Sequence, residues 1–149
     1  GGATRGALLP LLAELPAELV IVNRTVAKAQ ELAALAQQHQ TGQVPVQGLG
    51  YADLQGQTFD VVLNASSSSL TAELPPLPAS VFAPGCLAYD LTYGKGLTPF
   101  LQLAQHAGVT RVADGVGMLA EQAAEAFAWW RGVRPDTAAV IAQLTVPLV

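Results

Sequence analysis

Apolar residues along the chain follow two alternating patterns. Short, continuous apolar runs are typical of buried strands, and they cover residues 18–22, 43–49, 59–65 and 86–93. Longer stretches, in which apolar residues recur every three or four positions, predict helices over residues 1–15, 25–39, 98–108, 114–133 and 134–149. A single turn of helix is expected at 51–57, and loop over the Ser- and Pro-rich residues 66–80.

The alternation of strands and helices, without hairpin turns between strands, is typical of βαβ units and a parallel sheet. We therefore expect an α/β fold in a single domain covering residues 1–149. A domain of this kind should begin with a strand. This chain begins instead on a glycine-rich turn of the type that follows one, so the first strand of the sheet is missing from it.

Two of the predicted helices have an apolar stripe that we expect to be buried. In helix 25–39 the stripe consists of Ala29, Leu32, Ala33 and Ala36. In helix 114–133 it consists of Leu119, Ala123, Ala126, Phe127 and Trp130. Pro10 predicts a kink in the first helix, because proline lacks an N–H and its ring faces the carbonyl of Gly6.

Composition and charge narrow the class of protein. The net charge of −4 argues weakly against a nucleic-acid partner. No apolar run approaches the roughly 18 residues needed to span a bilayer, and no signal peptide opens the chain, so we expect no membrane partner and a cytoplasmic protein. The single cysteine, Cys86, excludes an internal disulfide and a multi-cysteine metal site, and we expect it to be a buried small side chain. His39 and His106 are expected at the surface, and no metal ligands are assigned.

Several polar clusters follow predicted strands, where ligands bind in open parallel sheets. The segment "GGATRG" would be the first turn between strand and helix, with Gly1 and Gly2 allowing the backbone to approach a diphosphate. Loop flexibility is an equally good explanation for such glycines. The segments "NASSSS" and "YDLTY" end two other strands, and in an extended chain Leu91 and Tyr93 would face the same way. A plain polar turn and a half-buried tyrosine are the structural alternatives.

The segment "NRT", residues 23–25, lies where dinucleotide-binding sheets meet the adenosine ribose. A carboxylate there would bind the ribose hydroxyls and repel a 2′-phosphate, but none is present. Arg24 can bind phosphate oxygens, Thr25 can donate a hydrogen bond, and Lys28 adds charge one turn later. This set favours NADP over NAD. The alternative is that Asn23 or Thr25 caps the helix and Arg24 is solvated.

Met118 and Gln122 are four residues apart on helix 114–133 and share a face that differs from the predicted core stripe. Gly115 stands just before this face begins. Beside a cofactor, Gln122 would be a group that hydrogen-bonds a substrate. On an ordinary helix it would point into solvent.

Taken together, these stretches resemble the shikimate dehydrogenase family. The matching pieces occur in the family's order and cover essentially the whole chain: "GGATRG", "NRTVAKA", "FDVVLNASSSS", "YDLTYGKGLTPFL" and "DGVGMLAEQAAEAFAWWRGVRPDT". The resemblance implies a Rossmann-like, doubly wound parallel sheet with helices on both faces. It also implies an NADP-dependent oxidoreductase that reduces 3-dehydroshikimate to shikimate in aromatic amino-acid (chorismate) biosynthesis.

The resemblance also assigns roles to residues. It places the diphosphate at Gly1, Gly2 and Ala3, and the adenosine 2′-phosphate at Asn23, Arg24, Thr25 and Lys28. It assigns Ala65, Ser66, Leu91, Gly115 and Met118 to the cofactor, and Tyr93 and Gln122 to shikimate. Ser66 replaces the family's Thr and Ser69 its Gly, and the second change puts the conformation of that loop in doubt.

The family's catalytic lysine and aspartate belong to an N-terminal substrate domain, so the resemblance assigns no catalytic residue to this chain. We expect Lys95 to be solvated and Asp90 to bond backbone. The chain would be the cofactor-binding half of the enzyme and would be inactive by itself. A homodimer remains possible. Two alternatives remain, a catabolic quinate/shikimate dehydrogenase, which Arg24 disfavours, and a non-catalytic NADP-binding module.

Overall fold

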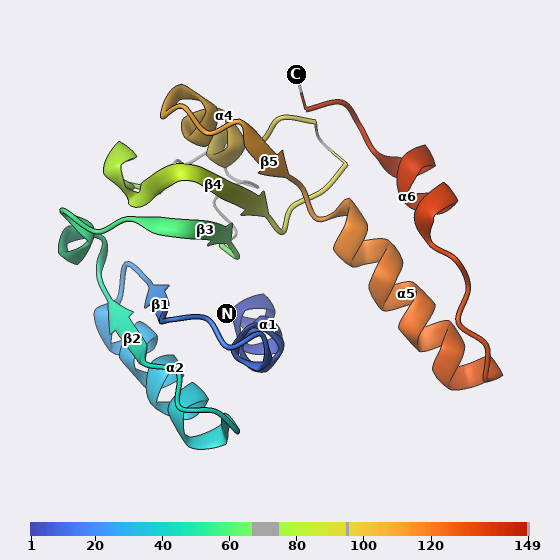
Figure 1. The fold of residues 1–149 in the computed structure, drawn as a ribbon, viewed down its shortest axis with the longest axis horizontal. Helices are drawn as coiled ribbons and strands as arrows, with labels where there is room; N and C mark the ends of the chain where they lie inside the picture. Colours follow the sequence, from blue (N-terminus) through green and yellow to red (C-terminus); the bar gives the residue numbers. More distant parts are fainter. Residues whose placement is uncertain (67–74, 95, 149) are drawn as a thin grey trace. The chain divides into compact units, whose positions relative to one another are not determined.

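The computed structural model of the chain describes residues 1–66, 75–94 and 96–148. Contacts within the chain divide it into two compact units. Unit 1 comprises residues 1–57 and 76–81, and unit 2 comprises residues 58–75 and 82–149. Figure 1 draws the elements of both units, and each unit is described by itself.

Unit 1 is a two-stranded parallel sheet with helices packed on it. It contains α1 (Gly2–Ala13), β1 (Leu19–Val22), α2 (Val26–His39), β2 (Val46–Leu49), the 3₁₀ turn η1 (Tyr51–Leu54) and the 3₁₀ turn η2 (Ala79–Val81). β1 pairs with β2 in register, from Leu19 opposite Val46 to Val22 opposite Leu49. These elements agree with the predicted strands and helices except for η2, which was predicted as loop, and Pro10 lies inside α1 as expected.

The core of unit 1 lies between α1, α2 and the sheet. Its buried residues are Leu8, Leu12, Ile21, Ala29, Leu32, Ala33, Ala36 and Val44. The four predicted residues of the α2 stripe are therefore all buried. α2 packs closely against β2 at Gly48. Any larger residue would be excluded there, because its Cβ would overlap the backbone of Ala29.

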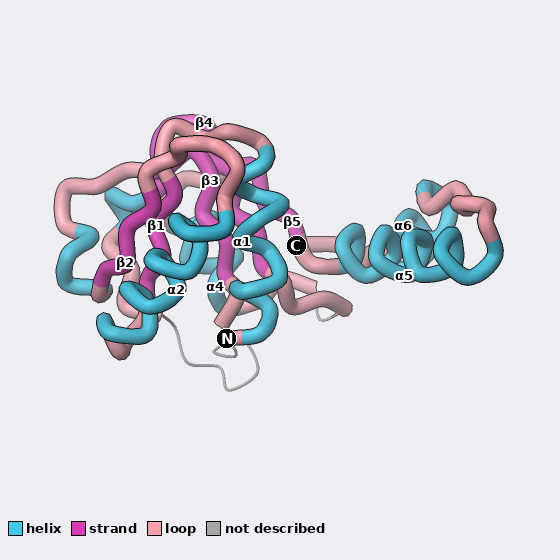
Figure 2. The backbone as a smooth tube through the Cα atoms, turned by 90° about the horizontal axis from the view of Figure 1, so that it is seen from below, coloured by secondary structure: helices cyan, strands magenta, loops and turns pink. Residues whose placement is uncertain are grey.

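Unit 2 is a three-stranded parallel sheet with one helix on it and a helical pair at its C-terminal end. Its strands are β3 (Phe59–Asn64), β4 (Phe82–Asp90) and β5 (Arg111–Ala113), in the order β3-β4-β5. Its helices are α4 (Pro99–His106), α5 (Val116–Arg131) and α6 (Ala138–Leu144). Figure 2 shows α5 and α6 running side by side.

Local sequence explains the helix ends of unit 2. Thr98 caps α4, since its hydroxyl oxygen accepts the N–H of Leu101 over 3.3 Å, and Pro99 occupies the first helical position. α5 ends at Arg131 because Gly132 adopts a left-handed conformation with φ 71°. Cys86 is buried and free, as expected, and the rings of Phe82 and Phe100 pack with centroids 6.3 Å apart.

The fold class is confirmed, since every strand pairing is parallel and helices alternate with strands. Among the described residues no strand precedes α1. The described strands form two separate sheets, β1-β2 and β3-β4-β5, and in the order 3-2-1-4-5-6 the first strand would stand between the strands that correspond to β1 and β3. Both strands therefore have one edge without a partner strand in the described part of the chain.

Several predictions about unit 2 were wrong. β5 was not predicted, because three residues are too few for a periodic pattern. The strand predicted at 86–93 begins at Phe82 and ends at Asp90, so Leu91 and Tyr93 lie in the loop beyond it. The last helix begins at Ala138, after Pro135 rather than around it.

The buried face of α5 also differs from the predicted stripe. The residues buried on α5 are Val116, Ala120 and Ala124, whereas Phe127 is 45% exposed and Trp130 is 72% exposed. α6, which lies beside α5, has no buried residue. The prediction chose the face with the largest side chains, but the covered face is the one whose small residues allow close packing.

Candidate functional site

The turn after β1 is shaped by Asn23. Its side-chain oxygen accepts the N–H of Thr25 over 2.9 Å, and its own N–H donates to the carbonyl of Leu49 over 3.2 Å. Thr25 is the N-cap residue of α2 but makes no side-chain capping bond. The Asn23 side chain therefore stabilises the turn between β1 and α2. The Thr25 side chain does not cap α2, so helix capping does not explain why a threonine stands at this position.

Positive charge collects where this turn enters α2. Arg24 and Lys28 are exposed, and the first turn of α2 contains no acidic residue. The N–H groups and dipole of a helix N-terminus add to the attraction for anions. The chemistry of this set fits a phosphate monoester.

The glycine-rich turn at the start of α1 leaves its backbone open. Gly1 is the N-cap residue and makes no side-chain capping bond, and its carbonyl accepts the N–H of Arg5 over 3.1 Å. A Cβ added to Gly1 or Gly2 would meet no atom within 4 Å, and Ala3 is exposed. Packing among the described residues therefore does not require these glycines, and the backbone is accessible to a diphosphate.

In unit 2 two of the predicted positions, Leu91 and Gly115, meet Asn64 and Thr92 at the carboxyl ends of the strands. The carbonyl of Asn64, the last residue of β3, accepts the N–H of Leu91 over 3.0 Å. Gly115 donates its N–H to the carbonyl of Thr92 over 3.1 Å. A Cβ on Gly115 would overlap the Leu91 carbonyl oxygen and lie 2.8 Å from its carbon. Gly115 is thus glycine because the loop after β4 passes directly over it.

The turn after β3 is held by Asn64, which is only 7% exposed. Its side-chain oxygen accepts the N–H of Ser66 over 3.2 Å and the Ser66 hydroxyl over 2.7 Å. This pair orders the residues around Ala65 at the end of the sheet. Ser67, Ser68 and Ser69 lie outside the described residues, as does Lys95, so the predictions about them stay open.

Asp90 anchors the loop that carries Leu91 and Tyr93. It is fully buried, and its carboxylate accepts the N–H of Thr92 over 3.0 Å and the hydroxyl of Thr98 over 2.7 Å. The expectation that Asp90 bonds backbone is confirmed. The bond to Thr98 links the loop to the start of α4, a connection that sequence spacing did not reveal.

The remaining predicted residues lie at the surface of unit 2. Tyr93 is 44% exposed and Met118 is 40% exposed, and Gln122, one turn after Met118 on α5, is also exposed. Burial raises the pKa of Tyr89, and the nearby backbone of Met118 partly opposes this rise. Tyr89, the residue before Asp90, therefore lies close to the backbone of the first turn of α5.

The described structure brings together Asn23 to Lys28 in unit 1 and Asn64, Leu91 and Gly115 in unit 2. Tyr51 was not among the predicted site residues. It begins η1, with one residue between it and the end of β2, and so lies at the carboxyl end of the strand that pairs with β1. Across residues 1–66, 75–94 and 96–148 no three His, Cys, Asp or Glu side chains are arranged to hold a metal ion, and no helix is long and apolar enough to cross a membrane.

Comparison with known proteins gives consistent results along the chain. Residues 115–145 match the family model described as the shikimate 5′-dehydrogenase C-terminal domain. An NADP(+) shikimate dehydrogenase of Dechloromonas aromatica is 54% identical over 149 residues, which is 100% of this chain and 53% of that protein. The chain spans about half the length of the curated relatives it matches.

Solved structures share the fold. An Ael1 enzyme from Pseudomonas putida is 61% identical, with a TM-score of 0.89 over 100% of this chain and 53% of that chain. A shikimate 5-dehydrogenase from Thermus thermophilus, solved with NADP(H) and shikimate, is 28% identical, with a TM-score of 0.70 over 93% of this chain and 49% of that chain.

Proposed function

Because the chain belongs over its whole length to the shikimate dehydrogenase family, we propose that it is the NADP-binding half of an enzyme that interconverts 3-dehydroshikimate and shikimate. The observation that carries the proposal is the turn after β1. It combines an exposed Arg24 and Lys28 with a helix N-terminus that lacks acidic residues.

In unit 1 the chain's own residues bind the adenosine end of the cofactor. Arg24 forks onto the 2′-phosphate, Lys28 adds charge, and the Thr25 hydroxyl donates to a phosphate oxygen. Asn23 keeps the turn in shape through its bond to the Thr25 N–H. The backbone at Gly1, Gly2 and Ala3 binds the diphosphate.

In unit 2 the residues near the strand ends orient the nicotinamide and the substrate. Leu91 and Met118 provide apolar surface for the ring, and the backbone at Gly115 holds the loop after β4 in place. Ala65 and Ser66 line the cofactor side. The Tyr93 hydroxyl and the Gln122 amide hydrogen-bond the hydroxyl groups of shikimate.

When bound, NADPH would supply the hydride that reduces 3-dehydroshikimate and NADP⁺ would accept it from shikimate, while the protein orients the cofactor against the substrate carbon. No residue of this chain has a proton-transfer role in the proposal, because the catalytic lysine and aspartate of the family belong to the half that the chain does not match. The chain alone should therefore show no turnover. The biosynthetic role implies action in the cytoplasm.

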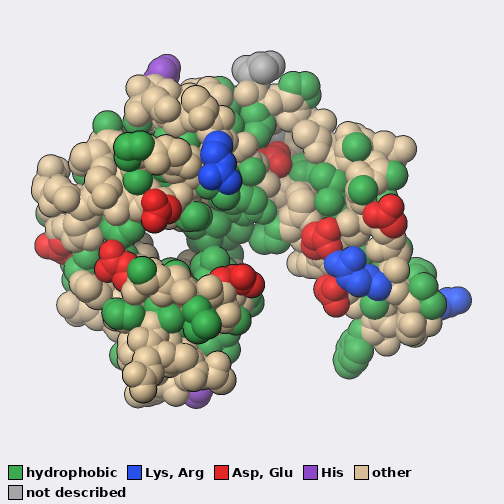
Figure 3. Space-filling model, in the orientation of Figure 1, with side chains coloured by type: hydrophobic (Ala, Val, Ile, Leu, Met, Phe, Trp, Pro, Cys, Tyr) green, Lys and Arg blue, Asp and Glu red, His purple; other side chains and the backbone are tan. Residues whose placement is uncertain are grey.

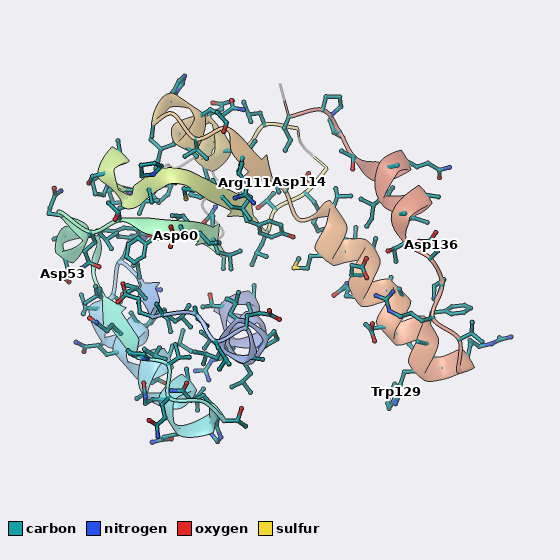
Figure 4. The ribbon with its side chains drawn as sticks, viewed as in Figure 1. Asp53, Asp60, Arg111, Asp114, Trp129 and Asp136 are labelled. Atoms are coloured by element: carbon teal, nitrogen blue, oxygen red, sulfur yellow. The ribbon has the colours of Figure 1, made fainter. Side chains whose placement is uncertain are left out.

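In the full-length protein, we expect the segment that corresponds to the unmatched half of the relatives to pack on α5 and α6. The apolar side chains exposed there include Phe127, Trp129, Trp130, Val133, Val140 and Leu144. Figure 4 shows Trp129 projecting away from the end of α5. Such a surface supports contact with a further apolar partner. A homodimer is the alternative occupant.

The cofactor proposal is tested by Arg24→Ala in the full-length protein. A charge-assisted bond contributes about 1.5–3 kcal/mol, so NADPH affinity should fall by roughly one to two orders of magnitude while NADH affinity stays nearly unchanged. Arg131→Ala, which removes an exposed cation at the end of α5, serves as the matched control. Equal losses for NADPH and NADH would overturn the assignment of Arg24.

The substrate proposal is tested by Gln122→Ala in the same protein. Shikimate kinetics should deteriorate, because a hydroxyl group of the substrate loses its partner, while NADP affinity should stay the same. Assaying shikimate and quinate in parallel separates the two dehydrogenase activities, and the catabolic alternative would be favoured if quinate were the better substrate. The absence of turnover with either would favour a non-catalytic module.

A further inference from the structure

The parallel register of unit 1 places Tyr51 beside the turn after β1. Val22 pairs with Leu49 at the end of the ladder. The ladder then continues, since the N–H of Asn23 donates to the carbonyl of Leu49 over 3.2 Å. Continued two residues beyond this last pair, the same register would bring Arg24 and Tyr51 to the same level.

The turn that carries Tyr51 is fixed on both sides. The N–H of Gly50 donates to the Asp53 carboxylate over 2.8 Å, and the Gln57 side chain donates to the Asp53 carbonyl over 2.9 Å. A Cβ on Gly50 would lie only 2.9 Å from Val26 in the first turn of α2. Figure 4 labels Asp53, which locates this turn. Tyr51 is thus held next to the helix end that receives the phosphate in the proposed function.

The electrostatic environment agrees with this placement. Tyr51 is half-buried, and burial raises the pKa of its phenol, while the positive charge of Arg24 opposes the rise. The phenol therefore keeps its proton near neutral pH and can donate it. A guanidinium has donors only, whereas a phenol oxygen can accept from a guanidinium and donate its own proton to an anion.

From this arrangement we infer that the Tyr51 hydroxyl donates a hydrogen bond to the phosphate on the adenosine 2′ position and adds to the preference for NADP that Arg24 sets. The inference rests on the proposed function and adds a specificity residue to it. Tyr51 lies outside the "NRT" segment, on a different strand-to-helix connection, and reaches the same phosphate from the neighbouring strand end.

The test compares Tyr51→Phe with the wild type in the full-length protein, by calorimetric titration with adenosine 2′,5′-bisphosphate and with 5′-AMP. These probes differ in the 2′-phosphate alone and need no turnover. Loss of one hydrogen bond to a charged group should weaken the bisphosphate on the order of tenfold and leave 5′-AMP unchanged. The ratio of NADP to NAD affinities should fall by the same factor.

Controls separate the hydroxyl from other effects. Tyr51→Phe keeps the ring, and its thermal unfolding should match the wild type. Tyr51→Leu should match Tyr51→Phe in the bisphosphate preference, and Gln55→Ala, an exposed change at the end of the same turn, should leave that preference intact.

The outcomes distinguish the two proposals. A wild type that binds the bisphosphate and 5′-AMP equally would overturn the proposed cofactor. A wild type that prefers the bisphosphate, loses this preference in Arg24→Ala and keeps all of it in Tyr51→Phe would overturn the role of Tyr51 and leave the proposed function standing. Equal weakening of both probes by Tyr51→Phe would assign Tyr51 to the adenine instead and would also overturn the inference.

Discussion

Helices α2 and α5 have similar apolar spacing but differ in what their apolar side chains contact. On α2 the predicted stripe is the buried one, and Ala29 is fully buried. On α5 the predicted stripe is largely at the surface, and Phe127 and Trp130 are 45% and 72% exposed. Spacing thus reports which residues share a face, and it does not report what covers that face.

The physical difference lies in the neighbouring element. α2 lies against β1 and β2, and Gly48 lets the backbones approach closely. α5 lies beside α6, which is short and has no buried residue. α5 and α6 are instead connected by polar groups, since Arg134 contacts Glu121 and Glu125 and Thr137 donates to Glu121 over 2.6 Å. Figure 3 shows acidic and basic side chains gathered in the region of α5 and α6.

The largest expected effect concerns residues 1–149 expressed alone. Within the described residues β1 pairs only with β2, and β3 only with β4. Buried backbone groups without partners cost about 1–3 kcal/mol each, against a total stability of about 5–15 kcal/mol for a domain. We expect early thermal unfolding, association in size-exclusion chromatography and weak NADP binding. A stable monomer that binds NADP tightly would contradict this expectation.

A truncation in the core of α2 should be costly. Leu32 is 5% exposed, and Leu32→Ala in the full-length protein should lower the free energy of unfolding by about 2–5 kcal/mol. Leu9→Ala on α1, where the side chain is 48% exposed, is the matched control and should cost less than about 0.5 kcal/mol. Urea denaturation measures both values. A small loss for Leu32→Ala would remove the contrast between the helices.

Glycine substitutions compare the same two regions. Gly48→Ala should destabilise by about 1–3 kcal/mol, because the new methyl group overlaps the backbone of α2. Gly117→Ala on α5 should be neutral or should stabilise by up to about 1 kcal/mol, since its Cβ would meet no atom within 4 Å and alanine favours helix. Equal thermal unfolding temperatures for the two variants would show that close packing does not explain Gly48.

Tryptophan fluorescence sharpens the account of α5. The chain has 2 tryptophans, Trp129 and Trp130, and both are exposed on this helix. If the segment that corresponds to the unmatched half of the relatives covers Trp129 and Trp130, the tryptophan emission of a full-length protein should be blue-shifted relative to that of the chain alone. Iodide quenching should fall in parallel. Identical spectra, in a full-length protein without further tryptophans, would assign the surface to another partner.

The smallest expected effect concerns the polar link between α5 and α6. Hydrogen bonds from Thr137 and Arg134 lower the pKa of the Glu121 carboxyl below its ordinary value of 4.5. A lowered folded-state pKa stabilises the protein above the unfolded value, and this contribution is lost as pH falls through the folded value. The effect should be small because the groups are exposed. The stability of Glu121→Gln should approach that of the wild type as pH falls below the lowered pKa of the Glu121 carboxyl, and a difference independent of pH would contradict this.

The amino-acid sequence by itself predicted the parallel α/β fold, the α2 core and the turn at Asn23, Arg24 and Thr25. These features depend on local properties, namely apolar periodicity, a polar stop after a strand and the absence of a nearby carboxylate. The capping pair Thr98 and Pro99 was predictable for the same reason.

Only the tertiary structure decided which face of α5 is covered, why Gly115 must be glycine and where Tyr51 stands. Gly115 meets the Leu91 carbonyl, and the charge of Arg24 acts on the Tyr51 phenol from another strand-to-helix connection. These relations join residues that are far apart in the sequence, so no spacing rule along the chain contains them. The physical reason is that packing and register depend on which segments become neighbours, and that choice is made by the fold as a whole.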